Sequence, residues 1–191
     1  MGRSAPLEPP GAPLTDGVVA LRRRRVGDLD AIAAASHDPE TVRWLDDPPM
    51  DEAARRSSMD RAARAWQTGQ GAPLVIADAE TDQPVGMVNL QFRNDEMATV
   101  AYGVFPGNRG RGIAPRAVRL LAEWAFTDLK LTELLLEADE ANTASVRVAE
   151  KCGFGLVGSR PEPGTGPAAA QRTMLVFARR GDRAEEADHA L

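Results

Sequence analysis

The feature that most constrains the fold is a glycine-rich turn that leads directly into an amphipathic helix, at residues 108–125 (NRGRGIAPRAVRLLAEWA). Gly110 and Gly112 lack a Cβ atom, so the backbone can turn sharply there and a ligand can approach closely. The apolar positions after the turn recur at helical spacing and would bury one face. They are Ala114, Ala117, Val118, Leu121 and Ala125. We therefore expect a helix that packs against a sheet, with the turn at its start.

The same turn is suited to hold a phosphate group. A helix start has free N–H groups and partial positive charge, and Arg109 and Arg111 add fixed charges beside it. Two other phosphate motifs fit poorly. Pro115 stands where a dinucleotide fingerprint has its third glycine, and the Gly-Lys-Ser/Thr of a P-loop is absent. A basic strand–helix connection without any ligand is the alternative that the turn alone leaves open.

The composition fits one globular domain. The chain has 191 residues, of which 43% are hydrophobic and 27% charged, and this length is enough for a substantial core. Prolines are dense at the start, so we expect residues 1–14 to be a disordered tail. We expect a single domain at residues 15–179 and a charged tail at residues 180–191.

Charge and cysteine content narrow the possible partners. The formal net charge of −5 gives no general affinity for nucleic acid. The single cysteine, Cys152, excludes an internal disulfide and fits a reducing cytoplasm. His37 and His189 are too few for a histidine metal cluster, and no apolar run is long enough to span a membrane. We expect a cytoplasmic protein without a metal, a nucleic-acid partner or a membrane anchor, and a homodimer is left open.

The hydrophobic pattern predicts a mixture of strands and helices. Three strands at residues 73–79, 85–93 and 97–105 are joined by short turns, which favours an antiparallel meander. A nearly continuous apolar run at residues 133–138 (ELLLEA) suits a buried strand. Asn142 is a good cap for a short helix at residues 144–151.

The remaining elements complete an α+β (mixed α/β) fold. We expect further strands at residues 18–24, 154–159 and 171–178, and helices at residues 28–37, 38–45 and 51–67. This order of elements predicts one mostly antiparallel sheet of six to seven strands, with helices on both faces.

Several motifs in this order resemble the GNAT superfamily of N-acetyltransferases. The pattern Arg109-x-x-Gly112-x-Ala114 is similar to the superfamily's pyrophosphate-binding motif, and QPVGMVNL is similar to its third-strand pattern. Asn142-x-x-Ser145 followed by AEKCGF resembles its second signature. The segment LRRRRVGDLDAIAAASHDPETVRWL resembles the entry region of the RimJ/RimL-type branch, which acetylates ribosomal-protein N-termini and other amines. The resemblance spans roughly residues 15–178.

This resemblance implies an acetyl-coenzyme A-dependent N-acetyltransferase whose acceptor is a primary amine of a protein N-terminus or a small molecule. It also implies a sheet that splays between its fourth and fifth strands, residues 97–105 and 133–138, where backbone groups near Phe105 pair with the pantetheine. The implied cofactor-binding residues are Val104, Phe105, Arg109, Gly110, Arg111, Gly112, Ile113, Ala114 and Asn142. The implied substrate-binding residues are Trp44, Asn89 and Thr99.

The resemblance makes Ser145 the candidate proton donor to the leaving thiolate, with Asn142 orienting it or the cofactor. Ala149 stands where many superfamily members have a tyrosine acid, so few other hydroxyl groups can serve. A helix cap and a solvent-exposed serine are the plain structural alternatives for Asn142 and Ser145.

The general base is left open. Thr99 and Arg116 stand where the branch usually has glutamates, and Glu137, Asp139 or a chain of waters are the alternatives. Because these groups are replaced, a non-catalytic acyl-coenzyme A sensor on the same fold is the alternative function. A nucleotide-binding regulatory domain is a third hypothesis.

Overall fold

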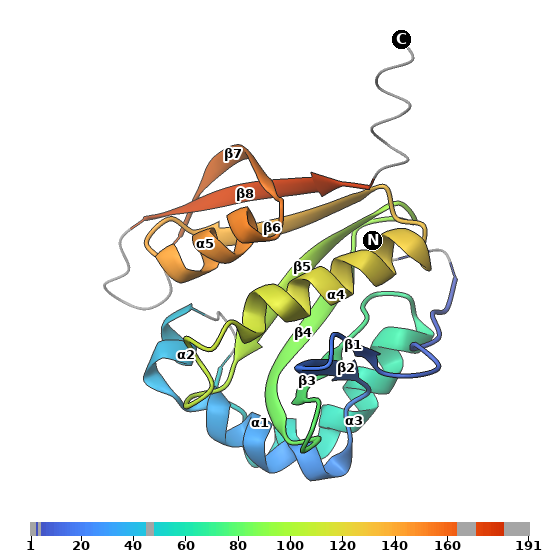
Figure 1. Ribbon diagram of the computed structural model, residues 1–191. Coiled ribbons are helices and arrows are strands. Elements are labelled where there is room, and N and C mark those ends of the chain that lie inside the picture. Colours follow the sequence, from blue (N-terminus) through green and yellow to red (C-terminus); the bar gives the residue numbers. More distant parts are fainter. Residues whose placement is uncertain (1–2, 4, 45–47, 164–170, 182–191) are drawn as a thin grey trace.

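A computed structural model of the chain describes residues 3, 5–44, 48–163 and 171–181 (Figure 1). The strands are β1 (Leu14–Thr15), β2 (Val19–Arg22), β3 (Leu74–Asp78), β4 (Pro84–Phe92), β5 (Met97–Val104), β6 (Glu133–Asp139), β7 (Gly155–Glu162) and β8 (Arg172–Arg180). The helices are the 3-10 helix η1 (Val26–Asp28), α1 (Leu29–Ser36), α2 (Pro39–Trp44), α3 (Glu52–Gln67), α4 (Ile113–Thr127) and α5 (Thr143–Lys151). The predicted α+β class is confirmed.

The strands form one sheet in the order β1-β2-β3-β4-β5-β6-β8-β7. Within the described residues, β5 and β6 are the parallel pair and the other neighbours are antiparallel. The sheet has eight strands where six to seven were expected. The additional strand is β1, in which Leu14 pairs with Leu21 of β2. A strand of two residues is too short to show any alternation of polar and apolar side chains, so the sequence pattern could not reveal it.

Helices cover both faces of the sheet, as predicted. The helix α4 lies along one face (Figure 1), and its predicted apolar stripe is buried at Ala117, Val118 and Leu121. On the opposite face, α1 and α3 pack against β4 through a smaller cluster that includes Ile32 and Met87. The glycine-rich turn is therefore held at the end of a helix anchored in the main core.

Two helix starts are fixed by side-chain caps. The Asp51 carboxylate accepts a hydrogen bond from the N–H of Ala54 at 2.6 Å and begins α3. The Asn142 side chain accepts one from the N–H of Ser145 at 3.1 Å and begins α5. The predicted cap at Asn142 is confirmed, and it places Ser145 in the first turn of α5.

The strands β5 and β6 pair over only part of their length. Their register runs from Met97 opposite Glu133 to Val100 opposite Leu136. Beyond that point β5 continues to pair with β4, and β6 continues to pair with β8. The two strands therefore separate at the end that leads into the glycine-rich turn, and the predicted splay is present.

The described N-terminal residues lie against the domain instead of extending freely from it. The N–H of Leu7 donates to the carbonyl of Trp66 at 2.9 Å, and the Leu7 side chain packs against the main core. The guanidinium of Arg3 stacks over the ring of Phe92 at 5.4 Å. Leu7 thus attaches the N-terminal segment to the core, which its proline-rich composition did not predict.

At the other end, β7 reaches Glu162, beyond its predicted end. Residues 164–170 of the predicted loop and residues 182–191 of the predicted tail lie outside the described residues.

Candidate active site

The glycine-rich turn has a backbone that only glycine adopts readily. Gly107, Gly110 and Gly112 have φ angles of 80°, 75° and 74°. A Cβ atom added at any of the three would meet no other atom within 4 Å. The glycines are therefore required by backbone conformation and not by crowding, and the space in front of the turn is open to a ligand.

The N–H groups of residues 110–114 point to no acceptor within the described part of the chain. Gly112 is the N-cap of α4 and makes no side-chain cap hydrogen bond. The one backbone hydrogen bond that closes the turn runs from the N–H of Asn108 to the carbonyl of Phe105 at 3.1 Å. Free N–H groups at a helix start, beside open space, fit the pyrophosphate of a coenzyme.

The two arginines of the turn have different roles. Arg111 is exposed and donates to the side chain of Asn108 at 3.1 Å, so it stays at the turn. Arg109 turns toward α2 and donates to Asp38 at 2.7 Å and to Glu40 at 2.9 Å. The hydrogen bond from Arg109 holds the pKa of Asp38 below its usual range. Arg109 therefore joins the turn to the start of α2.

The splay leaves backbone groups of β5 without a β6 partner next to Phe105, and the predicted residue Val104 is among them. The N–H of Phe105 donates to the carbonyl of Val85 at 2.9 Å, so it faces β4. Because backbone groups alternate in direction along a strand, those of Tyr102 and Val104 face the splay. The carbonyl of Val104 accepts a hydrogen bond from Arg109 at 3.2 Å. The groups that face the splay thus belong to Tyr102 and Val104, and of these the Val104 carbonyl is taken by Arg109, while Phe105 buries its side chain against α1.

Tyr102 is a site residue that the sequence analysis missed. It lies two residues beyond the last β5–β6 pair, and its hydroxyl oxygen is buried without a hydrogen bond of good geometry. Burial raises the pKa of Tyr102 to about 12, and interaction with the Ser145 hydroxyl lowers it. The two hydroxyl groups are therefore neighbours at the splay. The signal that could have found Tyr102 is its position on the strand that ends at the glycine-rich turn, where it is the only tyrosine of the chain.

Cys152 and Ala149 lie behind this pair in the core. Ala149, which stands at the position of the superfamily's tyrosine, is fully buried. The Cys152 thiol donates to the carbonyl of Pro115 at 3.4 Å, and burial raises its pKa. A protonated, buried thiol is a core group and not a nucleophile.

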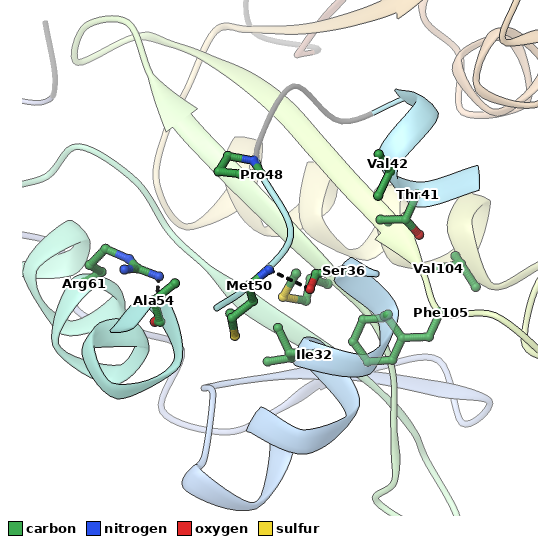
Figure 2. Close-up of a pocket in the computed structure, with 13 residues that line it drawn as sticks. Ile32, Ser36, Thr41, Val42, Pro48, Met50, Ala54, Arg61, Val104 and Phe105 are labelled. Carbon is green, nitrogen blue, oxygen red and sulfur yellow. Dashed lines mark hydrogen bonds between the residues drawn. The ribbon is translucent and has the colours of Figure 1, made fainter. Parts of the chain in front are cut away.

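A cavity of about 380 Å³ opens on the α1 face of the sheet (Figure 2). Its walls come from α1, α2, α3 and the ends of β4 and β5. Val104 and Phe105, both predicted cofactor-site residues, line it together with Ile32 and Thr41. The cavity therefore meets the splay at Val104 and is the natural place for an acceptor.

Trp44 ends α2 beside this cavity but is not among the residues that line it. The guanidinium of Arg43 stacks over its ring at 4.5 Å. Thr41 and Val42 of the same helix line the cavity instead.

Asn89 and Thr99, the other two predicted substrate-binding residues, do not line the cavity. The Asn89 side-chain oxygen is buried without a partner. Thr99 is 6% exposed and accepts a hydrogen bond from Arg93 at 2.9 Å. Met87, two residues before Asn89 on β4 and therefore on the same side of the sheet, does line the cavity.

The two carboxylates considered as bases follow the last β5–β6 pair on β6. Glu137 is hydrogen-bonded to Arg160 at 2.7 Å and lies 3.9 Å from Arg93. Asp139 accepts a hydrogen bond from the N–H of Ala141 at 2.8 Å. Both carboxylates are thus engaged by other groups of the chain.

Across the described residues, no group of three or more His, Cys, Asp and Glu side chains is arranged to hold a metal ion. None of the helices in this part of the chain is both long and apolar enough to cross a membrane.

A splayed sheet, a glycine-rich turn at a helix start and a cavity that meets the splay are together the features of an acyltransferase. Residues 19–155 match the acetyltransferase (GNAT) domain family, and the protein belongs to this family.

Comparison with individual proteins agrees with this assignment. The chain is 24% identical over 139 residues to the uncharacterized N-acetyltransferase p20 of Bacillus licheniformis, which covers 71% of this chain and 78% of that protein. It also shares the fold of spermidine N-acetyltransferase from Vibrio cholerae in complex with CoA and spermine, with a TM-score of 0.77, 19% identity and coverage of 89% and 99% of the two chains.

A ribosomal L7/L12 alpha-N-protein acetyltransferase, RimL, in complex with coenzyme A is similar to the same degree. Its TM-score is 0.76 at 17% identity, with coverage of 89% of this chain and 97% of that one. Because these two neighbours differ in their acceptors and are equally similar, the structural comparison shows the fold and does not single out one branch of the family.

Proposed function

We propose that this protein transfers the acetyl group of acetyl-coenzyme A to a primary amine, as a RimJ/RimL-type enzyme. The observation that carries the proposal is the set of unpartnered N–H groups at residues 110–114, which face open space beside the splay. The bound coenzyme supplies the acetyl group as a thioester.

The cofactor is held mainly by backbone. The N–H groups of Gly110, Arg111, Gly112, Ile113 and Ala114 bind its phosphates, and Arg111 adds positive charge from the exposed rim. The backbone groups of Tyr102 and the N–H of Val104 face the splay and bind the pantetheine amides there. Arg109 supports the turn from behind through its bonds to α2.

The amine reaches the splay through the cavity that Val104 and Phe105 line. Its nitrogen forms the new bond to the acetyl carbon while the bond from that carbon to sulfur breaks. Ser145 donates a proton to the sulfur and regains one from water, and Asn142 fixes Ser145 through its backbone N–H. The amine loses its proton to water, because Glu137 is occupied by arginines.

Trp44, Asn89 and Thr99 are proposed to shape the approach of the acceptor from the edge of the cavity. The acceptor is a small-molecule or peptide amine, the setting is the cytoplasm, and no metal takes part. The relatives support an amine acceptor in general terms, since one neighbour is a spermidine N-acetyltransferase and another a protein N-terminal acetyltransferase.

A thiol-release screen tests this proposal. Acetyl-coenzyme A is incubated with the protein and a panel of peptides and small primary amines, and free thiol is measured together with mass analysis of the acetylated product. We expect amine-dependent thiol release. Tight coenzyme A binding without release from any amine would identify a non-catalytic sensor instead.

A further inference from the structure

The acceptor cavity is apolar along most of its wall but carries positive charge at one end. Among the described residues that line it, Arg61 of α3 has the only charged side chain. Figure 2 shows Arg61 and Ala54 at one end of the cavity and Val104 and Phe105 at the other. Because the cavity meets the splay at Val104, the arginine lies at the end away from the reacting amine.

Arg61 is held in place by its own helix. It donates to the carbonyl of Ala54 at 3.0 Å and to the hydroxyl of Ser57 at 2.5 Å. Neither partner carries a charge, so both hydrogen bonds orient the guanidinium without neutralising it.

A second arginine lies behind the wall. Arg24 donates to the hydroxyl of the buried Ser58 at 2.7 Å and contacts the sulfur of Met87 at 3.5 Å. Its Nε atom is buried and has no hydrogen-bond partner. Burial and the neighbouring charge of Arg61 both lower the pKa of Arg24. The two guanidinium groups are therefore neighbours, since Ser58 lies one helical turn before Arg61 on α3. Arg61 lines the cavity, while Arg24 touches its wall at Met87.

The described side chains provide no ion pair for Arg61 or Arg24. Asp28 acts on Arg24 only at longer range, because both of its oxygens are hydrogen-bonded by Arg22 at 2.9 Å. Arg24 is half-buried, and a cation in such a place is unfavourable without a carboxylate unless a ligand supplies the anion. Arg61 is exposed, so its charge is accessible to a ligand that enters the cavity it lines.

We infer that the acceptor is a primary amine with an apolar body whose far end carries a carboxylate or a phosphate, and that Arg61 and Arg24 bind this anion. The inference rests on the proposed function and names its substrate class. A polyamine such as the spermine bound by the Vibrio cholerae neighbour would bring an ammonium group to the same arginines, so it is expected to be a poor acceptor.

The test uses acceptors that share one amine and one six-carbon chain but differ at the other end. Hexylamine ends in a methyl group, 6-aminohexanoate in a carboxylate, 6-aminohexyl phosphate in a phosphate, and 1,6-diaminohexane in an ammonium. The kcat/KM of thiol release should be at least about tenfold higher for the anionic amines than for hexylamine, since a charge-assisted hydrogen bond is worth that factor. The kcat/KM for the diamine should be lower than that for hexylamine. The kcat/KM values for the two anionic amines show whether a carboxylate or a phosphate is preferred.

Two variants of the same helix locate the effect. Arg61→Glu should reverse the order and make 1,6-diaminohexane a better acceptor than 6-aminohexanoate. Arg56→Gln is the matched control, because Arg56 is exposed and pairs with Glu52 one turn away at 3.3 Å. This control should keep the wild-type order. An unchanged order in a folded Arg61→Glu protein would overturn the inference.

A binding measurement separates this inference from the proposed function. The same amines are titrated by calorimetry into the protein saturated with coenzyme A, where no transfer can occur. If the anionic amines bind more tightly in this titration but no amine releases thiol from acetyl-coenzyme A in the separate assay, the anionic subsite is supported and the proposed function is overturned. Thiol release or binding without a preference for the anionic amines would overturn the subsite, whatever the fate of the acetyl group.

Discussion

Arg109 of the glycine-rich turn donates a hydrogen bond to Asp38 at 2.7 Å, and this contact ties the proposed phosphate site to the helix that lines the acceptor cavity. A second contact, to Glu40 at 2.9 Å, occupies the other terminal nitrogen of the guanidinium. We propose that Arg109 supports the turn through these two contacts, and its predicted role as a direct phosphate ligand is the alternative that the following substitution tests.

If Arg109 supports the turn, one substitution should weaken and not strengthen coenzyme A binding. Asp38→Asn should weaken coenzyme A binding severalfold, because it loosens the turn although residue 38 does not belong to the phosphate site. If Arg109 bound the phosphates directly, the same change would release the guanidinium and strengthen binding. Calorimetry with coenzyme A decides between the two, and Glu52→Gln on α3 serves as the control for loss of an exposed acid.

Gly112→Val should reduce coenzyme A affinity at least about tenfold, because a branched residue disfavours positive φ by roughly 1–2 kcal/mol and would project into the phosphate space. Gly17→Val is the matched control: Gly17 has a φ of 84°, and a Cβ there also meets nothing within 4 Å. Both variants carry the same kind of strain, but Gly17 lies in the turn before β2. Equal coenzyme A affinities for the folded Gly112→Val and Gly17→Val proteins would show that the glycine-rich turn does not belong to the cofactor site.

Ser145→Ala should lower kcat by about tenfold, the low end of what general-acid assistance is worth, because a thiolate is already a fair leaving group. Coenzyme A affinity should remain close to that of the wild type. Thr143→Ala removes an exposed hydroxyl from the same helical turn and should leave kcat unchanged. Wild-type kcat and KM in Ser145→Ala would assign the proton to water.

Tyr102 can be followed directly, because it is the only tyrosine in the chain. Phenolate absorbance should appear at a pH near 12, against an ordinary value of 10.0, since burial raises the pKa of Tyr102. Because the pKa is raised on folding, the associated stability is fully present below pH 10 and is lost as the pH rises toward 12. The prediction fails if the phenol titrates near its ordinary value while circular dichroism still shows folded protein.

Substitution of Ser145, the neighbour of Tyr102, provides a second test of the Tyr102 environment. Ser145→Ala should raise the pKa of Tyr102 further, because the Ser145 hydroxyl lowers it. An unchanged titration curve in that variant would place the two hydroxyl groups apart.

Deletion of residues 1–13 should lower the melting temperature by several degrees. The deletion removes the Leu7 side chain from the main core and its hydrogen bond to Trp66, and about 1 kcal/mol shifts the melting temperature of a domain of this size by roughly 2–4 °C. Leu7→Ala isolates the packing contribution. Deletion of residues 182–191, which lie outside the described residues, is expected from their charged composition to change the melting temperature little. An unchanged melting temperature in the N-terminal deletion would show that residues 1–13 contribute no stability, as expected for the free tail that the sequence predicted.

Much of the site could be anticipated because its chemistry is local. Positive φ at Gly110 and Gly112, the apolar stripe of α4 and the cap at Asn142 each depend on residues within a few positions of one another. The contacts that were missed are long-range. Arg109 and Asp38 are separated by 71 positions, and no local pattern links them. Tyr102 and Ser145 come from different elements and meet only because β5 and β6 separate.

The sequence by itself determined the family, the α+β class, the meander of β3, β4 and β5, and the glycine-rich turn before α4. These follow from the spacing of apolar residues and from the local backbone preferences of glycine, asparagine and proline. The folded structure was needed to show that β8 lies between β6 and β7, that Leu7 returns to the core, and that Arg24 lies close to Arg61. Strand order and cavity walls depend on which distant surfaces bury one another, and that choice is made by the packing of the whole chain.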